Sequence, residues 1–471
     1  MIEILKVVVD TINAYIWTIL VYVLLGAGIY FTIKTKFVQF RHFKESMTRM
    51  KVGKRVSDDA ISPFQAFATG LASRVGTGNI AGVAIALVIG GPGAIFWMWI
   101  TALIGMSSAF IESSLGQLYK VQNKDGSYRG GPAYYITIGL GQKWLGIVFA
   151  LSLILAFGFV FNAVQSNTMV AATHKAWGWN AQYVGIGLVL IVAPIIFGGI
   201  KRVAKVAEKI VPIMAILYLL AVIYMIITNI TMVPKVIYLI ISEAFNFKAA
   251  GGGAIGVFTV SMMQGIKRGL FSNEAGMGSV PNAAAASDAY HPANQGLIQM
   301  LGVFVDTIII CSCTAFIILL SGVYGTTDAT GAELTQMALE AGIGSYGSSF
   351  LAIIILLFCF SSIVGNYAYA ESNVQFIKNN KFIMITFRIM VLAMVYFGSI
   401  QELPLVWNMA DASMGIMAFT NLVSILLLSP AAFLLLKDFE EQIKAGKNPE
   451  FDINKYPNLK EKIKTGIWEK S

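Results

Sequence analysis

The chain has 471 residues, of which 56% are hydrophobic and 13% are charged, whereas soluble domains usually carry about 25% charged residues. Its mean hydropathy of +0.71 indicates a protein that crosses a membrane several times. The formal charge of +9 is then expected in cytoplasmic loops and does not indicate nucleic-acid binding. The three cysteines and three histidines show neither a disulfide framework nor the spacing of metal ligands.

Eleven apolar segments are long enough to cross a hydrocarbon layer of about 30 Å. They lie at 14–33, 64–90, 93–118, 144–172, 182–199, 210–228, 252–288, 295–322, 347–377, 382–399 and 404–436. The first segment lacks a small-residue cleavage site and is followed by basic residues, so we expect a retained helix and not a signal peptide. The sequence therefore predicts an all-α membrane protein.

Lysine and arginine are concentrated in alternate loops of this arrangement. The basic loops are 34–55, 119–132, 200–209 and 378–381. With eleven spans they fall on the same side as the charged tail, and the positive-inside rule assigns that side to the cytoplasm. The loop 323–346, on the other side, is poor in basic residues. We therefore expect a protein of the cell membrane with its N-terminus outside and its C-terminus inside.

Ten spans remain when the first is set aside, and they divide into two groups of five. The predicted organisation is an N-terminal helix with a basic loop (1–62), a first repeat (63–228), an extracellular connection (229–250), a second repeat (251–436) and a cytoplasmic tail (437–471). Because five is odd, the two groups must cross the membrane in opposite directions. Each group begins with a glycine-rich, polar segment, and such paired interruptions point to the binding site of a secondary transporter.

The interruption in the first repeat is Gly-Thr-Gly-Asn at 76–79. A break in a membrane helix frees backbone N–H and C=O groups that protein, water or a ligand must satisfy. The half-helix that begins near Gly78 points its N–H groups into the break and suits a carboxylate. The carbonyls near Val75 suit a cation or an ammonium group. The alternative is that Gly76, Gly78 and Gly82 only allow close helix packing, but the matching break in the second repeat favours a site.

Long motifs in the two repeats are recognisable. They are GLASRVGTGNIAGVA (70–84), GGPGAIFWMW (90–99), GIKRGLFSNEAGMGS (265–279), FVDT (304–307) and FSSIVGNYAYAE (360–371). With them the chain resembles the alanine or glycine:cation symporter family, or sodium:alanine symporter family, over roughly 14–436. The resemblance implies a leucine-transporter-like fold, in which an extra N-terminal helix precedes a five-plus-five inverted repeat with broken first and sixth core helices. It also implies uptake of a small neutral amino acid driven by Na⁺, or sometimes by H⁺.

The resemblance implies a Na⁺ site between the first broken helix and the eighth core helix. Its ligands would be the carbonyls of Ala72 and Val75 and the hydroxyls of Ser361 and Ser362. Carbonyl and hydroxyl oxygens are hard ligands that suit such a cation. The alternative role for the two serines is hydrogen bonding between helices. Apart from Na⁺ as coupling ion, no cofactor is expected.

The substrate site is expected at both breaks and on the third core span. The predicted residues are Thr77, Gly78, Asn79, Phe161, Gln165, Met263, Gly265, Ile266 and Phe271. By resemblance, Thr77 and Gly78 donate backbone N–H groups to a carboxylate, while Asn79 contacts the carboxylate or a nearby cation. Gln165, a glutamine deep in an apolar helix, needs a partner, which is either the substrate's ammonium group or another helix.

The other predicted substrate contacts surround these polar groups. Phe161 lies one turn before Gln165 and walls the pocket. Gly265 and Ile266 offer carbonyls to the ammonium group at the second break. Met263 and Phe271 bound the pocket for the side chain.

Charges within membrane spans are costly and functional by default. They are Arg74, Glu112, Lys267, Arg268, Glu274, Asp306 and Glu371. We expect Lys267, Arg268 and Glu274 to form a gate on the cytoplasmic side of the second break. Arg74 lies in the first break, where it pairs with Glu274 or Asp306, reaches the cytoplasmic vestibule, or replaces one coupling cation.

These observations predict a Na⁺-coupled symporter for a small neutral amino acid, with alternating access around a site near the membrane midplane. A proton-coupled amino-acid symporter is the alternative. No catalytic constellation indicates an enzyme, and a channel has no use for two apposed broken helices. The expected partners are the amino acid, Na⁺ and the lipid bilayer, with no nucleic acid and no obligate protein partner. The sequence leaves open whether the substrate is alanine, glycine or glutamine.

Overall fold

The structure is a computed structural model that describes residues 2–51, 60–124, 126–245 and 254–469. Most of these residues are helical. The long helices are α1 (Ile2–Lys34), α6 (Gly93–Leu118), α9 (Phe161–Trp177), α11 (Gly199–Thr228), α13 (Ala254–Asn273), α18 (Tyr346–Ile377), α19 (Lys381–Ser399) and α20 (Leu403–Lys444). The helices of intermediate length are α4 (Pro63–Arg74), α8 (Lys143–Leu153), α10 (Ala181–Ile196), α12 (Val233–Ala244), α15 (Pro292–Val303) and α17 (Gly331–Ile343).

Short elements connect these helices. The short α-helices are α2 (Val38–Arg41), α3 (Phe43–Arg49), α5 (Val83–Gly90), α7 (Pro132–Gly139), α14 (Pro281–Ala286), α16 (Ser312–Leu320) and α21 (Pro457–Lys462). The π-helical segments are η1 (Gly78–Gly82), η2 (Ile154–Val160) and η3 (Phe304–Cys311), and η4 (Ile453–Lys455) is a 3₁₀ turn. The strands β1 (Val121–Gln122) and β2 (Tyr128–Arg129) form a small antiparallel hairpin with Val121 opposite Arg129.

In the described part of the chain, eight helices are long and apolar enough to cross a membrane. The pair Pro63–Arg74 and Gly78–Gly90, bent by 49°, makes a ninth if it is one span. The apolar helix α10 is shorter. The predicted span 252–288 begins outside the described residues and then comprises α13, a turn and α14. The predicted count of eleven spans therefore stays a prediction.

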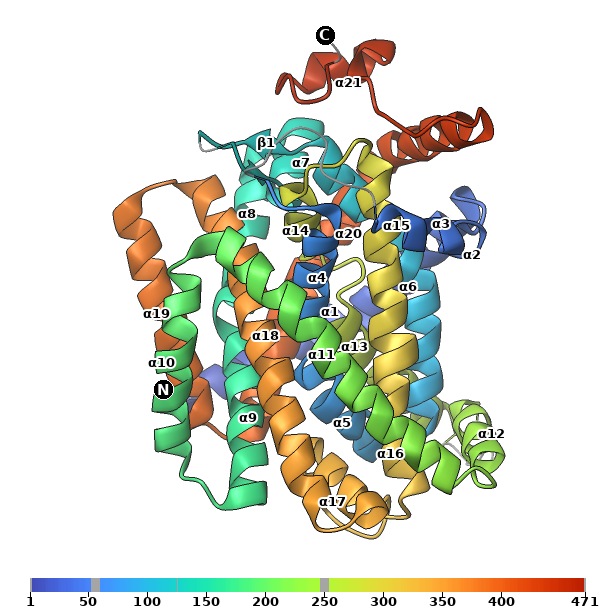
Figure 1. Cartoon of the computed structure of the whole chain (residues 1–471), viewed down its shortest axis with the longest axis vertical. Helices are drawn as coiled ribbons and strands as arrows, with labels where there is room; N and C mark the ends of the chain where they lie inside the picture. Colours follow the sequence, from blue (N-terminus) through green and yellow to red (C-terminus); the bar gives the residue numbers. More distant parts are fainter. Residues whose placement is uncertain (1, 52–59, 125, 246–253, 470–471) are drawn as a thin grey trace.

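The helices are arranged so that the connecting elements gather at two ends. Figure 1 shows α2, α3, β1, α7 and α21 at one end of the molecule, and α12 and α17 at the other. We call the first the basic end, because the predicted basic loops lie there, and the second the opposite end. The middle of the bundle holds the broken helix made of α4, η1 and α5.

One predicted loop is helical in the structure. The basic segment 200–209 forms the first turns of α11, which begins at Gly199. Its small and apolar side chains Val203, Ala204 and Ala207 are buried, whereas Lys201 is exposed. The prediction of a loop was wrong here because lysine and arginine are good helix formers when they face solvent. The helix therefore continues beyond the apolar stretch.

The C-terminal tail is packed against the basic end. Trp468 is 1% exposed, and its indole N–H donates to the carbonyl of Leu118 over 3.0 Å. Its ring lies 5.8 Å from that of Phe451, and the ammonium of Lys120 lies 4.8 Å from the indole centroid. The backbone N–H of Ile453 donates to Trp468 O. The tail thus covers the end of α6 beside the β1–β2 hairpin.

We predict that Trp468→Ala destabilises the protein by about 3–5 kcal/mol, because it leaves a cavity and removes the partner of the Leu118 carbonyl. Chemical or thermal unfolding of the detergent-purified protein measures the change. The control is Trp144→Ala, since Trp144 is 64% exposed and is expected to cost much less. Equal destabilisation of the two variants would contradict the packed position of the tail.

Candidate functional site

The first break separates α4 from η1. Helix α4 begins with a capping box between Ser62 and Gln65 and ends at Arg74. Val75 is extended, with φ −77° and ψ 96°, so the carbonyls of the last α4 turn lose their helical donors. The chain resumes as a π-helical turn at Gly78. The break therefore lies where the glycine pattern predicted it.

Side chains satisfy the backbone N–H groups that the break frees. Gly76 N donates to Asn79 Oδ1 over 2.8 Å, and Thr77 N donates to Gln165 Oε1 over 3.0 Å. Gln165 comes from α9, so the structure brings it to Thr77 as the predicted pocket requires. All four residues are buried. In this conformation Gln165 takes the N–H group that was predicted for a carboxylate.

Glycine is needed in the break because other segments approach closely. A Cβ atom on Gly76 would collide with Ser362 Oγ and would lie 2.8 Å from Gln165 Oε1. A Cβ atom on Gly78 would lie 2.9 Å from Phe271 Cδ1. Helices α9, α13 and α18 therefore meet at these two glycines. The predicted pocket residues Gly78 and Phe271 are in direct contact range.

The four residues predicted for the ion lie together between α4 and α18. Ser362 Oγ donates to Val75 O over 3.2 Å, and Ser361 Oγ lies 3.5 Å from Ala72 O. The two hydroxyls also lie 3.0 Å and 2.8 Å from Phe358 O. All of these oxygens belong to buried residues. The arrangement is a cluster of hard oxygen donors beside the break.

The second break is a turn held by a buried carboxylate. Helix α13 ends at Asn273, and Glu274, Gly276 and Gly278 have φ of 59°, 84° and 83°. The Glu112 carboxylate of α6 accepts the N–H of Gly276 over 3.1 Å and that of Gly278 over 3.0 Å. Asn421 of α20 donates to the same carboxylate over 2.8 Å. Glu112 thus fixes the turn.

The expectation that Gly265 and Ile266 lie at the second break is wrong. Both lie inside α13, and Gly265 is eight residues before its end, about 12 Å along a helix. A Cβ atom on Gly265 would collide with Ala94 O of α6, so this glycine serves close packing. Met263 lies in the same part of α13 and is partly exposed. The chain leaves helical geometry only at Glu274, where φ is positive.

A row of aromatic rings covers the first break. The centroids of Phe161 and Phe271 are 4.6 Å apart, and those of Phe271 and Trp407 are 4.7 Å apart. Phe157 continues the row at 4.6 Å from Phe161. Trp407 lies near the start of α20, whose last turns reach the basic end. The row runs from η2 through α9 and α13 to the start of α20. The sequence analysis missed Trp407.

Two of the three predicted gate residues pair with an aspartate. Arg268 Nη2 lies 2.5 Å from Asp411 Oδ2, and Lys267 Nζ lies 3.7 Å from the same atom. The Arg268 guanidinium also lies 4.7 Å from the centroid of Trp407. Lys267 and Arg268 therefore pair with Asp411, whereas Glu274 bonds to Ser73 and Ser279. Their role as a cytoplasmic gate stays a prediction. Asp411 was missed, although a carboxylate within the apolar run 404–436 was a signal.

Glu274 and Asp306 each collect hydroxyl groups. Glu274 Oε1 lies 2.7 Å from Ser73 Oγ, and its Oε2 accepts from Ser279 Oγ over 2.5 Å. Asp306 Oδ2 accepts from Ser272 over 2.8 Å, and Asp306 Oδ1 accepts from Asn79 Nδ2 over 2.7 Å. The Asn79 side-chain oxygen also accepts the N–H of Gly76, so both the oxygen and the nitrogen of its amide are bonded to protein groups. Asn79 therefore shapes the break in this conformation.

Arg74 is buried and forms no direct ion pair with any residue that the structure describes. It is 2% exposed, and its Nη1 donates to Gln299 O over 3.1 Å. Its Nε and Nη2 have no hydrogen-bond partner among the residues that the structure describes. The guanidinium interacts electrostatically with Glu112, Glu274 and Asp306 without direct contact. The expected direct pair with Glu274 or Asp306 is not formed.

Comparison with known proteins gives a family match over most of the chain. Residues 2–453 match the family model described as "Sodium:alanine symporter family". The probable sodium/glutamine symporter GlnT of Bacillus subtilis is 50% identical over 95% of this chain and 94% of its own. The sodium/alanine symporter AgcS of Methanococcus maripaludis is 39% identical over 92% and 97%. The crystal structure of MhsT in complex with L-phenylalanine superposes on this chain with a TM-score of 0.54 at 13% identity. The superposition covers 81% of this chain and 99% of MhsT. The chain therefore has the leucine-transporter fold.

We predict that Gly76→Ala destabilises the folded protein by about 1–3 kcal/mol, because its Cβ displaces Ser362 Oγ and crowds Gln165 in a packed interior. Unfolding of the purified protein measures the change. The control is Gly187→Ala in α10, where a Cβ atom would meet nothing within 4 Å. If Gly76→Ala is as stable as Gly187→Ala, the close approach of α18 to the break is wrong.

Proposed function

Because the chain belongs to the sodium:alanine symporter family, we propose that it imports a small neutral amino acid together with Na⁺. The family and the apolar helices make it a multi-pass membrane protein. Relatives are named for alanine and for glutamine, so alanine, glycine and glutamine are the candidate substrates. We expect Na⁺ as the only coupling ion and no catalytic activity.

The oxygen cluster at the first break is the observation that carries this proposal. Four oxygens from Ala72, Val75, Ser361 and Ser362 face one another across α4 and α18. A Na⁺ ion among them would link the two helices through hard ligands. It would also neutralise the negative end of α4, whose last carbonyls point into the break. The ion would therefore stabilise the conformation in which the neighbouring N–H groups are presented.

The substrate would bind at those N–H groups. We propose that its carboxylate accepts the backbone N–H groups of Thr77 and Gly78, at the positive end of the following half-helix. Gln165 now accepts the Thr77 N–H, so the carboxylate must displace it. The displaced amide oxygen is then free to accept from the ammonium group. Phe161 and Phe271, which are in ring contact, would enclose a small side chain.

Alternating access is proposed around this site. We propose that the aromatic row and the Arg268–Asp411 pair close the path towards the opposite end in this conformation. We propose that the opposite end is extracellular, in an eleven-span arrangement with its N-terminus outside and its C-terminus inside. The repeats 63–228 and 251–436 would then be the inverted halves. Separation of Phe161 from Phe271 would open the site outwards.

We predict that Ser362→Ala raises the Na⁺ concentration for half-maximal uptake by about tenfold, because one hard ligand is lost while the break stays intact. Substrate affinity should recover at saturating Na⁺, since coupling between two ligands is reciprocal. Uptake of labelled alanine, glycine and glutamine into proteoliposomes, with Na⁺ varied against K⁺, measures both effects. Thr77→Phe is the matched contrast and should impair uptake at every Na⁺ concentration.

The outcome for the unmutated protein decides the coupling ion. Saturable uptake that requires a Na⁺ gradient supports the proposal. Uptake that ignores Na⁺ and follows a pH gradient supports the proton-coupled alternative instead. If Ser361→Ala and Ser362→Ala both leave the Na⁺ dependence unchanged in folded protein, the ion site is elsewhere.

We predict that a cysteine at Thr326 reacts with an impermeant thiol reagent added to whole cells, whereas a cysteine at Lys447 reacts only after the cells are opened. Both positions are exposed in the structure, one at the opposite end and one after α20. The native cysteines, Cys311, Cys313 and Cys359, are buried and give a low background. The reverse labelling pattern would invert the proposed topology.

A further inference from the structure

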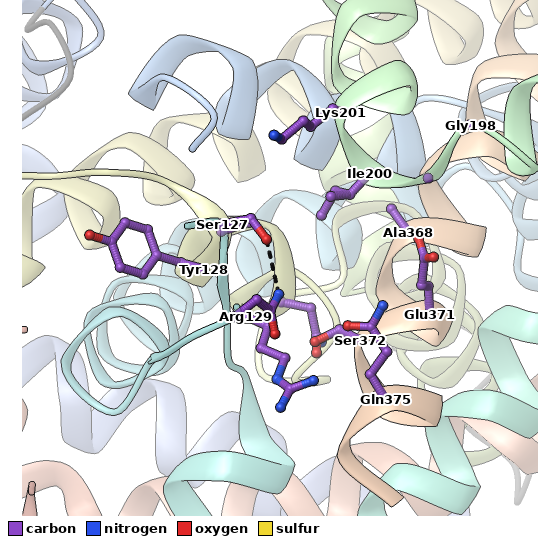
Figure 2. Close-up of a pocket in the computed structure, with 14 residues that line it drawn as sticks. Ser127, Tyr128, Arg129, Gly198, Ile200, Lys201, Ala368, Glu371, Ser372 and Gln375 are labelled. Atoms are coloured by element: carbon purple, nitrogen blue, oxygen red, sulfur yellow. Dashed lines mark hydrogen bonds between the residues drawn. The ribbon is translucent and has the colours of Figure 1, made fainter. Parts of the chain in front are cut away.

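A polar cavity of about 220 Å³ lies at the basic end, away from the first break. Its walls come from the β1–β2 hairpin, the turn between α10 and α11, α14 and α18. Figure 2 shows Ser127 and Arg129 on the hairpin side, Ile200 and Lys201 at the start of α11, and Glu371, Ser372 and Gln375 on α18. The site described above shares none of these residues.

Two charged side chains in this cavity are only partly satisfied. Arg129 Nε and Nη1 are buried and have no hydrogen-bond partner in the described ranges of the chain. Glu371 Oε1 lies 3.1 Å from Arg388 Nη2, and the carboxylate also interacts with the hydroxyl of Tyr367. Its buried Oε2 has no hydrogen-bond partner of good geometry among the described residues. The Glu371 side chain is 8% exposed. A buried polar group without a partner costs about 1–3 kcal/mol, and more when it is charged.

Neighbouring groups keep the two walls of the cavity in place. Ser372 Oγ donates to Gly130 O over 3.2 Å, which ties the end of the hairpin to α18. Gly199 has φ of 67°, and a Cβ atom there would lie 3.9 Å from both Glu371 carboxylate oxygens. A glycine at the turn thus leaves open the space in front of Glu371. The cavity has a positive group on the hairpin and a negative group on α18.

The cavity and the central site lie along the same helix, α18. Glu371 follows Ser362 by nine residues on the same helix, which is about 14 Å. The proposed ion ligands therefore lie on the part of α18 nearer the break, and the cavity lies on the part nearer the basic end. Nine residues make about two and a half turns of helix, so Glu371 lies on the face of α18 opposite to Ser362 and nearer the basic end.

We propose that this cavity is a second, weaker binding site for the zwitterion of the transported amino acid. Arg129 binds the carboxylate, and Glu371 Oε2 accepts from the ammonium group. A zwitterion satisfies both unpartnered groups without adding net charge, which neither an anion nor a cation does. The inference rests on the proposed function, because the central site supplies the solute.

The test is equilibrium binding of labelled alanine to the purified full-length protein by a wash-free proximity assay, in NaCl and in KCl. We expect a Na⁺-dependent class and a weaker class that persists in KCl. Arg129→Gln should weaken the second class at least about tenfold and leave the first unchanged. Gln165→Ala should do the reverse. Glu371→Gln should likewise weaken the second class and leave the first unchanged. Size-exclusion chromatography must first show that this variant is monodisperse.

The control and the competitors separate the possible outcomes. Arg202→Gln removes a positive charge from the same end, but Arg202 donates to Pro194 O and does not line the cavity, so both classes should persist. Propionate and ethylamine each carry half of the zwitterion and should compete less well than alanine. If the weak class is absent, survives Arg129→Gln, or responds to propionate as it does to alanine, the second site is wrong. If only the Arg129-sensitive class exists, the proposed function fails while the cavity assignment stands.

Discussion

The backbone break at residues 75–77 is the constraint on which the rest of the structure depends. A helix interrupted within a bilayer must have its freed N–H and C=O groups satisfied by the protein. Here an amide from the same segment, a glutamine from α9 and a serine hydroxyl from α18 satisfy them. These three elements are therefore fixed around the break. Side chains that satisfy these backbone groups can give way to a ligand that makes the same hydrogen bonds, which is why we propose the break as the binding site.

Buried carboxylates extend this constraint from the first break to the second. Glu112 holds the turn that follows α13 through two backbone N–H groups. Asp306 joins Asn79 of the first break to Ser272 just before the second. Arg74 interacts electrostatically with Glu112, Glu274 and Asp306 without forming a direct ion pair with them. Because each carboxylate bonds to groups from different helices, the two breaks are positioned as one unit.

The two sides of this unit are built differently. On one side lie the ring contacts among Phe161, Phe271 and Trp407 and the Arg268–Asp411 pair. Towards the basic end, α18 leads from the serine pair to a polar cavity. One side therefore has an apolar cover with an ion pair, and the other has a charged cavity. This difference suits a protein that passes a polar solute through its middle. The packed C-terminal tail lies at the basic end.

The sequence by itself determined the membrane class, the place of the first break and the family, because hydropathy and long motifs are local properties that can be read along the chain. It also placed Gln165 and the serine pair correctly in relation to the break. It misplaced the second break by about two turns of helix, since glycines that serve close packing, such as Gly265, look the same as glycines that end a helix. Only the tertiary structure decided three features: the pairing of Arg268 with Asp411, the support of the second turn by Glu112, and the lack of a direct ion pair for Arg74 among the described residues. Those contacts join residues far apart in the chain. They depend on how whole helices pack against one another, which local sequence patterns do not determine.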